Sequence, residues 1–168
     1  MKRAFTSLVL GLALLVGGGG AGFAQDNGSA LAIYNRGDYA TAFSQFSVLA
    51  AQGNAFAQYM LGFMYSNGEG VTQDYREAVR WYRLSAEQGY GLAQFNLGLM
   101  YGLGQGVTRD FVYSHMWFNI AATTSRGADA AEAAEFRDRT AARAMTAAQI
   151  ARAQELARQC VARSYRGC

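Results

Sequence analysis

The sequence predicts an all-α protein, an α/α solenoid of stacked helical hairpins with an extra helical pair at its C-terminal end. The main observation is an internal repeat: residues 61–81 recur 36 positions later as residues 97–117, with ten of the 21 positions identical. Self-similarity at a period of about 20 to 50 residues is typical of stacked solenoids. The 168-residue chain also contains 20 glycines and no proline, which fits helices joined by glycine turns.

The first helix of each hairpin is predicted from small and apolar residues on one face. Ala57, Leu61, Gly62 and Tyr65 each have an identical counterpart 36 positions later. Their spacing of i, i+4, i+5 and i+8 is that of one helical face. A glycine inside this face indicates that the partner helix packs closely against the backbone.

A glycine loop and a capped second helix complete the hairpin. The Gly-x-Gly loops at 68–70 and 104–106 are expected to need positive φ angles. Asp74 and Asp110 follow them as N-caps, and Glu77 is placed to form a capping box with Asp74. Gly89 then ends the second helix and separates the two copies.

The repeats divide the chain into segments. The pattern of the second helix also occurs 36 positions upstream, so residues 28–53 form a partial repeat that caps the stack, followed by repeats at 54–89 and 90–125. Helices within 129–162 follow, and Thr146 with Gln149 forms a capping box for the last one. This last helix is expected to pack against the final repeat and shield its open end.

Both copies contain the motif Leu-Gly-x-x-Tyr-x-x-Gly-x-Gly-Val-x-x-Asp, followed by Trp-Tyr or Trp-Phe. The motif resembles the Sel-one-like repeat family, a relative of the tetratricopeptide repeats. The resemblance extends over about residues 30–124. It implies an α/α superhelix whose concave face holds other proteins, in a secreted bacterial member of the family.

The N-terminus predicts export. Lys2 and Arg3 precede an apolar run, and Ala24 ends a small-residue cleavage site, so residues 1–24 are expected to be a signal peptide and 25–168 the repeat domain. An uncleaved membrane anchor is the alternative, although the apolar run is shorter than the about 20 residues that a span needs. The protein is therefore expected to be periplasmic or secreted, without a stable membrane span.

The charge pattern excludes several functions. After cleavage the chain contains no lysine, which excludes Ser-x-x-Lys acylases, lysine-dependent phosphate loops and Schiff-base enzymes. It contains 13 arginines and 12 acidic residues, and this nearly balanced charge does not favour nucleic-acid binding. The arginines and acids of 129–143 interleave as a solvated helix face.

Catalytic signals are sparse, and the protein is predicted not to be an enzyme. His115 is the single histidine, and no second histidine or nearby cysteine completes a metal site or a triad. No cofactor or metal is expected. The alternative is an envelope enzyme acting on peptidoglycan or a β-lactam, with His115 or a loop acid as its reactive group. A cysteine-rich branch of the resembling family is linked to β-lactams, but this chain lacks the per-repeat cysteines.

Cys160 and Cys168 are the two cysteines of the chain. We expect a disulfide between them, which in an oxidising compartment would fasten the C-terminal tail to the last helix. Two free thiols, or a bridge between two chains, are the alternatives.

Binding is expected on the concave wall, which predicts a scaffold that holds a protein or peptide partner in the cell envelope. By analogy with tetratricopeptide grooves, the first helices should present side chains facing away from the second helices. The alternative is that these residues only fill the stack, and a structural dimer through the last helix is a third possibility. The predicted partner-binding residues are Tyr59, Phe63, Ser66, Asn67, Phe95, Asn96 and Leu99.

Overall fold

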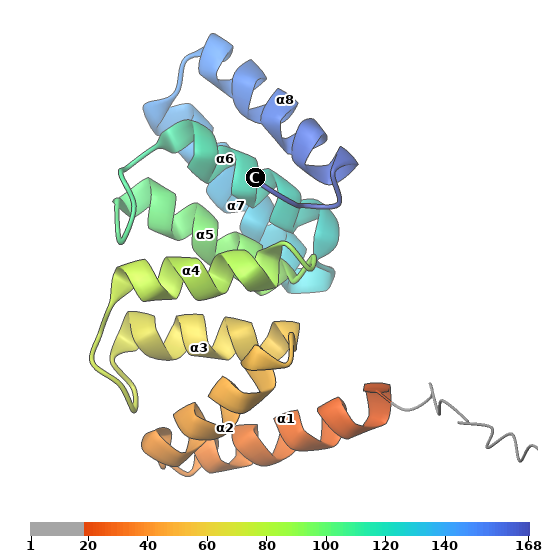
Figure 1. Ribbon diagram of the computed structural model, residues 1–168. Helices are drawn as coiled ribbons and strands as arrows, with labels where there is room; N and C mark the ends of the chain where they lie inside the picture. The colour runs from red at the N-terminus through yellow and green to blue at the C-terminus, as the bar shows by residue number, and fades with distance from the viewer. Residues whose placement is uncertain (1–18) are drawn as a thin grey trace, which may run out of the picture.

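The computed structural model describes residues 19–168, with side chains from residue 27 onward (Figure 1). These residues form eight helices joined by short loops, so the all-α solenoid prediction is confirmed. The helices are α1 Gly19–Asn35, α2 Tyr39–Ala51, α3 Ala55–Asn67, α4 Tyr75–Ala86, α5 Gly91–Leu103, α6 Phe111–Thr124, α7 Gly127–Ala144 and α8 Ala147–Ala162.

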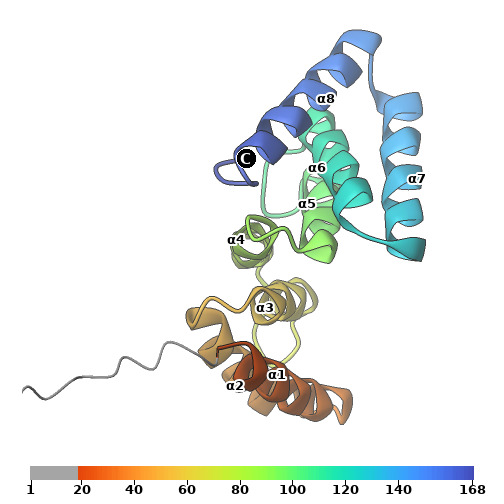
Figure 2. The ribbon, with the colours of Figure 1, turned by 90° about the vertical axis from the view of Figure 1, so that its right-hand side faces the viewer.

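Successive helices form hairpins that stack on one another. Helices α1 and α2, α3 and α4, and α5 and α6 pack as pairs, and α2 with α3 and α4 with α5 connect the pairs. Helices α7 and α8 both pack against α6. Figure 2 shows α3 and α5 on one side of α4, with α8 slanting across the top of the stack and α7 upright beside α5 and α6. The first helices therefore share one face of the solenoid.

The first helix is longer than the sequence pattern suggested. The pattern places a helix from about Ala30, whereas α1 begins at Gly19. The predicted cleavage site after Ala24 falls inside this helix, and residues 1–18 of the predicted signal peptide lie outside the described residues.

The glycine of each first helix lets an aromatic ring lie on the backbone. An ideal Cβ placed on Gly62 would be 2.6 Å from Cδ1 of Tyr82, and one on Gly98 would be 2.6 Å from Cδ1 of Phe118. Both rings are almost completely buried. The close helix packing that these glycines predicted is thus present in both hairpins.

The second loop glycine of each hairpin touches the preceding hairpin. Gly70 has φ +70°, and a Cβ there would overlap the backbone carbonyl of Tyr39 at the start of α2. Gly106 has φ +71° and lies in the same way against Tyr75 at the start of α4. Glycine is required here for its backbone conformation and for its small size.

The aspartate caps form as predicted. Asp74 Oδ1 accepts hydrogen bonds from the backbone N–H of Arg76 (2.8 Å) and Glu77 (3.1 Å), and Asp110 caps α6 in the same way. The capping box expected for Glu77 is wrong. Its carboxylate pairs with Arg80 at 2.8 Å, because an arginine three residues ahead on the helix offers a charged donor.

Buried glutamines tie each hairpin to the one before it. Gln58 Nε2 donates to the carbonyl of Ala50 at 3.2 Å, and Gln94 Nε2 donates to the carbonyl of Ala86 at 3.1 Å. These carbonyls lie at the C-terminal ends of α2 and α4, where backbone acceptors lack partners within the helix. Gln88 Nε2 also donates to Gln58 Oε1 at 2.7 Å.

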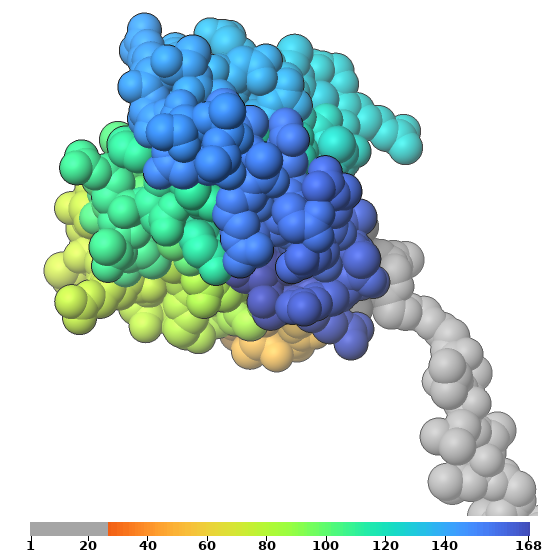
Figure 3. Space-filling model, turned by 90° about the horizontal axis from the view of Figure 1, so that it is seen from above, coloured from red at the N-terminus to blue at the C-terminus, as the bar shows by residue number. Residues whose placement is uncertain are grey.

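Helix α8 and the C-terminal tail cover one end of the solenoid. Ala157 and Cys160 of α8 belong to the same buried cluster as Trp117 of α6, and Figure 3 shows α8 in dark blue over this end. The predicted capping box at the start of α8 is present. A disulfide with an S–S distance of 2.06 Å joins Cys160 to Cys168. The tail is thereby held near α4, where the N–H of Gly167 donates to Glu87 Oε1 at 3.3 Å.

Candidate partner-binding cleft

A cleft of about 170 Å³ opens where α3, α5 and the start of α7 meet. Because its walls come from successive hairpins, the stacking of the repeats creates it. Four of the seven predicted binding residues line it. The lining residues are Tyr59, Phe63, Leu92, Phe95, Asn96, Ser125, Asp129 and Glu132.

Aromatic rings form the α3 wall. Tyr59 and Phe63 are one helical turn apart, so their rings lie on the same face with centroids 6.4 Å apart. Tyr59 also packs against Tyr90 at 5.2 Å and Tyr82 at 6.0 Å. These neighbours restrain the Tyr59 ring, which also lines the cleft.

The tyrosines remain protonated at neutral pH. Burial raises the pKa of Tyr59, the side chain of Asn96 acts in the opposite direction, and the carboxylate of Asp129 raises it further. The pKa of Tyr90 is also raised, first by burial and then by Tyr59 and Asp129. The cleft lining therefore contains the protonated phenol of Tyr59 together with the carboxyl group of Asp129.

Ser66 does not face away from the second helix, so this part of the prediction is wrong. Its hydroxyl donates to the carbonyl of Phe63 at 2.8 Å and lies 3.4 Å from the hydroxyl of Tyr82 on α4. The reason is the long side chain of Tyr82, which crosses the bare backbone at Gly62 and reaches the neighbouring turn of α3.

Asn67 and Leu99 lie elsewhere. Asn67 is the exposed last residue of α3, and Leu99 is a half-buried residue of α5 that is not part of the cleft lining.

Phe95 is less open than the sequence implies. Its ring packs against Phe118 of α6 at 5.3 Å and against Phe136 of α7 at 5.2 Å. Helix α7 has no counterpart in the repeats, so the period could not place it there. Phe95 thus lines the cleft and also packs against α7.

Leu92, Ser125, Asp129 and Glu132 were not predicted as site residues. The two acids are three residues apart on α7, and the sequence pattern assigned both of them to a solvated helix face. Their i, i+3 spacing showed that they share one side of a helix. Only the packing of α7 beside α5 shows that this side borders the aromatic wall.

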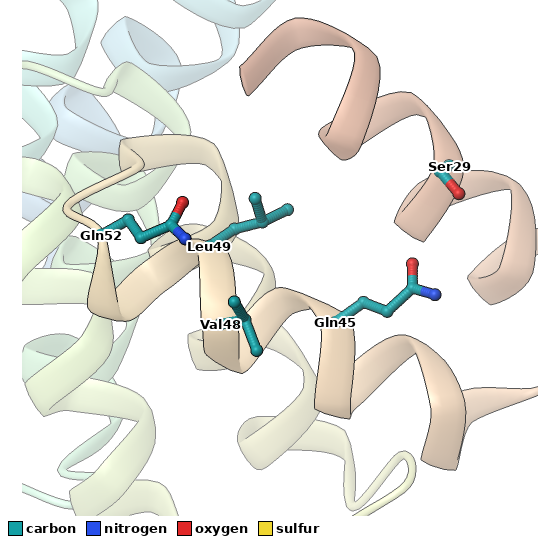
Figure 4. A pocket seen from close by; sticks show the side chains of 5 residues that line it. All are labelled: Ser29, Gln45, Val48, Leu49 and Gln52. Atoms are coloured by element: carbon teal, nitrogen blue, oxygen red, sulfur yellow. The ribbon is translucent and has the colours of Figure 1, made fainter. Parts of the chain in front are cut away.

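A second hollow of about 330 Å³ lies between α1 and α2. Figure 4 shows Ser29 on α1 across from Gln45, with Val48, Leu49 and Gln52 along α2. Its lining is uncharged and comes from the first hairpin alone. Unlike this hollow, the cleft is lined by side chains from both repeated hairpins, α3–α4 and α5–α6.

His115 is not at the cleft. It lies in α6 with 2% of its surface exposed, and its Nδ1 has no hydrogen-bond partner. Burial lowers the pKa of its imidazole, and the nearby Arg137 lowers it further. Within residues 19–168 no cluster of three or more histidine, cysteine, aspartate or glutamate side chains is arranged to hold a metal ion. Over the same residues, no helix combines the length and apolarity needed to cross a membrane.

Comparison with known families identifies the hairpins. A family model described as Sel1 repeat matches residues 55–90 and 91–123, which contain α3, α4, α5 and all of α6 except its last residue. The chain contains two Sel1 repeats. The resemblance inferred from the Leu-Gly-x-x-Tyr motif is confirmed, and the Sel1 repeats supply the α3 and α5 walls of the cleft.

Solved structures agree with this assignment. One is a protective antigen present in uropathogenic Escherichia coli strains, which displays an SLR fold. The two sequences are 29% identical, the TM-score is 0.77, and the match covers 85% of this chain and 31% of the Escherichia coli chain. Another is a Sel1 repeat protein from Oxalobacter formigenes, which is 35% identical with a TM-score of 0.50 over 51% of this chain and 66% of that one. This chain thus spans about a third of the Escherichia coli protein. None of the curated proteins matches the chain.

Proposed function

We propose that this protein is an exported scaffold that holds a protein or peptide partner in the cell envelope through the shared face of its first helices. The observation that carries the proposal is the cleft, which gathers aromatic and amide side chains from successive Sel1 repeats on one face. Aromatic side chains are enriched where proteins bind one another. Repeat solenoids typically bind partners on such extended inner surfaces.

Two features support export to an oxidising compartment. Residues 1–24 have the basic, apolar and small-residue regions of a signal peptide, and residues 25–168 would be the mature repeat domain. The Cys160–Cys168 disulfide is of the kind that persists outside the cytosol.

Photo-crosslinking in cells of the source organism tests the scaffold. The photoreactive residue p-benzoylphenylalanine replaces Phe63 in the cleft or, as a matched control, Leu84 of α4, which is 38% exposed and lies outside the cleft. Irradiation should give a discrete adduct from position 63 and none from position 84. Adducts that are absent at position 63, or the same at both positions, would contradict the proposal.

A further inference from the structure

The charges at the cleft have one sign. Helices α3 and α5 contain no aspartate, glutamate, lysine, arginine or histidine. The charged residues in the cleft lining are Asp129 and Glu132 of α7, and both are acidic and exposed. An uncharged aromatic wall therefore faces a wall that carries two negative charges.

The two carboxylates and the rings of Tyr59 and Phe63 line the same small cleft, so one ligand group can meet both. The field of Asp129 reaches the hydroxyls of both Tyr59 and Tyr90 and contributes to the raised pKa of each. Tyr59 lines the cleft together with Asp129, and its ring packs against that of Tyr90 with the centroids 5.2 Å apart. Aromatic rings attract cations through their quadrupoles, and a neighbouring carboxylate adds to this attraction.

The size of the cleft limits what can enter. Its volume of about 170 Å³ is below the about 300 to 1,000 Å³ of pockets for cofactors and drug-sized ligands. It fits one side chain of a partner. An acidic side chain would be repelled by Asp129 and Glu132, and a purely apolar one would gain nothing from these two exposed carboxylates.

The stability of helix α7 explains the position of Asp129 but not that of Glu132. An acid in the first turn, such as Asp129, is favoured by the helix dipole. Glu132 lies beyond the first turn and forms no ion pair among the described residues, unlike Glu135 on the same helix, which pairs with Arg139 at 3.3 Å. Glu132 is therefore available to a ligand.

We propose that the cleft binds an arginine or lysine side chain of the partner, with its aliphatic stem along Tyr59 and Phe63 and its charge at Asp129 and Glu132. This inference rests on the proposed scaffold function and specifies the chemistry of the partner: a basic residue in a segment that lies across the first helices. Long basic side chains commonly bury their stems on apolar surface while the charged end stays near water.

A peptide selection tests the inference without knowledge of the natural partner. Random linear peptides displayed on phage are selected in parallel on the wild-type protein, on the double variant Asp129→Asn, Glu132→Gln, and on the matched control Glu135→Gln, Glu155→Gln. The control removes the same charge from exposed acids outside the cleft. Thermal melts followed by circular dichroism verify that all three proteins are folded.

Arginine or lysine should be enriched on the wild type and the control, and this enrichment should disappear on the cleft variant. One selected peptide and its twin with glutamine at the basic position are then measured by fluorescence anisotropy at low salt. The twin, and equally the Asp129→Asn, Glu132→Gln variant, should each weaken binding by about tenfold. Combining the two changes should weaken binding little further, because both remove the same contact.

The outcomes separate the inference from the scaffold proposal. The cation site would be overturned if the selected peptides lacked a basic residue and bound the Asp129→Asn, Glu132→Gln variant as well as the wild type. If the same peptides did not bind a Phe63→Gln variant, the scaffold proposal would still hold. Failure to select any peptide, together with no adduct at position 63, would overturn both.

Discussion

The contact between Gly62 and Tyr82 allows a quantitative test of how the hairpins pack. Replacing Gly62 with alanine removes a poor helix former, which by itself stabilises a helix by about 1 kcal/mol. The new methyl group would lie 2.6, 2.7 and 2.9 Å from three atoms of the Tyr82 ring. The ring has only 1% of its surface exposed, so it has little room to move. Overpacking of this kind costs about 1 to 3 kcal/mol.

The gain and the cost together mean that Gly62→Ala should lower the free energy of unfolding by up to about 2 kcal/mol, which corresponds to a fall in Tm of up to about 6 °C for a domain of this size. Gly28→Ala is the matched control, because Gly28 lies in α1 and a Cβ there meets nothing within 4 Å. Its Tm should stay the same or rise by about 2 to 4 °C. Differential scanning calorimetry measures both values.

A double-mutant cycle shows whether the ring is the cause. In a Tyr82→Leu background the methyl group at position 62 should cost much less, because the overlapping ring is gone. If Gly62→Ala raises Tm as the control does, or costs the same with leucine at position 82, the close-packing argument is refuted.

Three further predictions follow from the core and the tail. Cys168→Ser should lower the free energy of unfolding by about 2.5 kcal/mol, because opening the disulfide loop raises the entropy of the unfolded chain. The wild type unfolded by urea in the presence of a reductant should lose the same amount, and an unchanged urea midpoint would contradict a structural role for the bond. The folded-state pKa of His115 lies below its ordinary 6.5, so the unfolded chain binds the proton more readily and the urea midpoint should decrease as the pH is lowered from about 7.5 to 5.5. His115→Gln should make the midpoint less dependent on pH, and an equally steep dependence in this variant would contradict the role of His115. Gln94→Leu removes the hydrogen bond to the Ala86 carbonyl and should cost about 1 kcal/mol, whereas the exposed control Gln154→Leu should stay within about 0.5 kcal/mol in the same urea titrations.

The sequence predicted the parts of the fold that depend on local rules and on the repeat. Asp74 and Asp110 cap helices because a short acceptor before a helix bonds its free N–H groups. Gly62 and Gly98 indicated close packing because they recur at equivalent positions of the two copies. Gln58 and Gln94 also recur 36 positions apart, so the same comparison could have identified the bonds between hairpins.

The cleft could be predicted only in part. Tyr59 and Phe63 were predicted because they share a face of a repeated helix. Ser66 was misplaced because the helix period says nothing of how far a tyrosine on the partner helix reaches. Asp129 and Glu132 lie on α7, which follows the last repeat, so their distance from the aromatic wall depends on long-range packing that no periodic pattern encodes.

The contact of Gly70 with Tyr39, repeated by Gly106 with Tyr75, has a consequence for how such a chain can change length during evolution. Each loop fits the start of the helix one period upstream, so an insertion or deletion of a few residues would break the fit on one side. Loss of the whole segment 54–89 would instead bring Gly106 to Tyr39, which offers the same surface. Gene duplication and deletion in steps of one complete unit are thus the changes that this architecture tolerates.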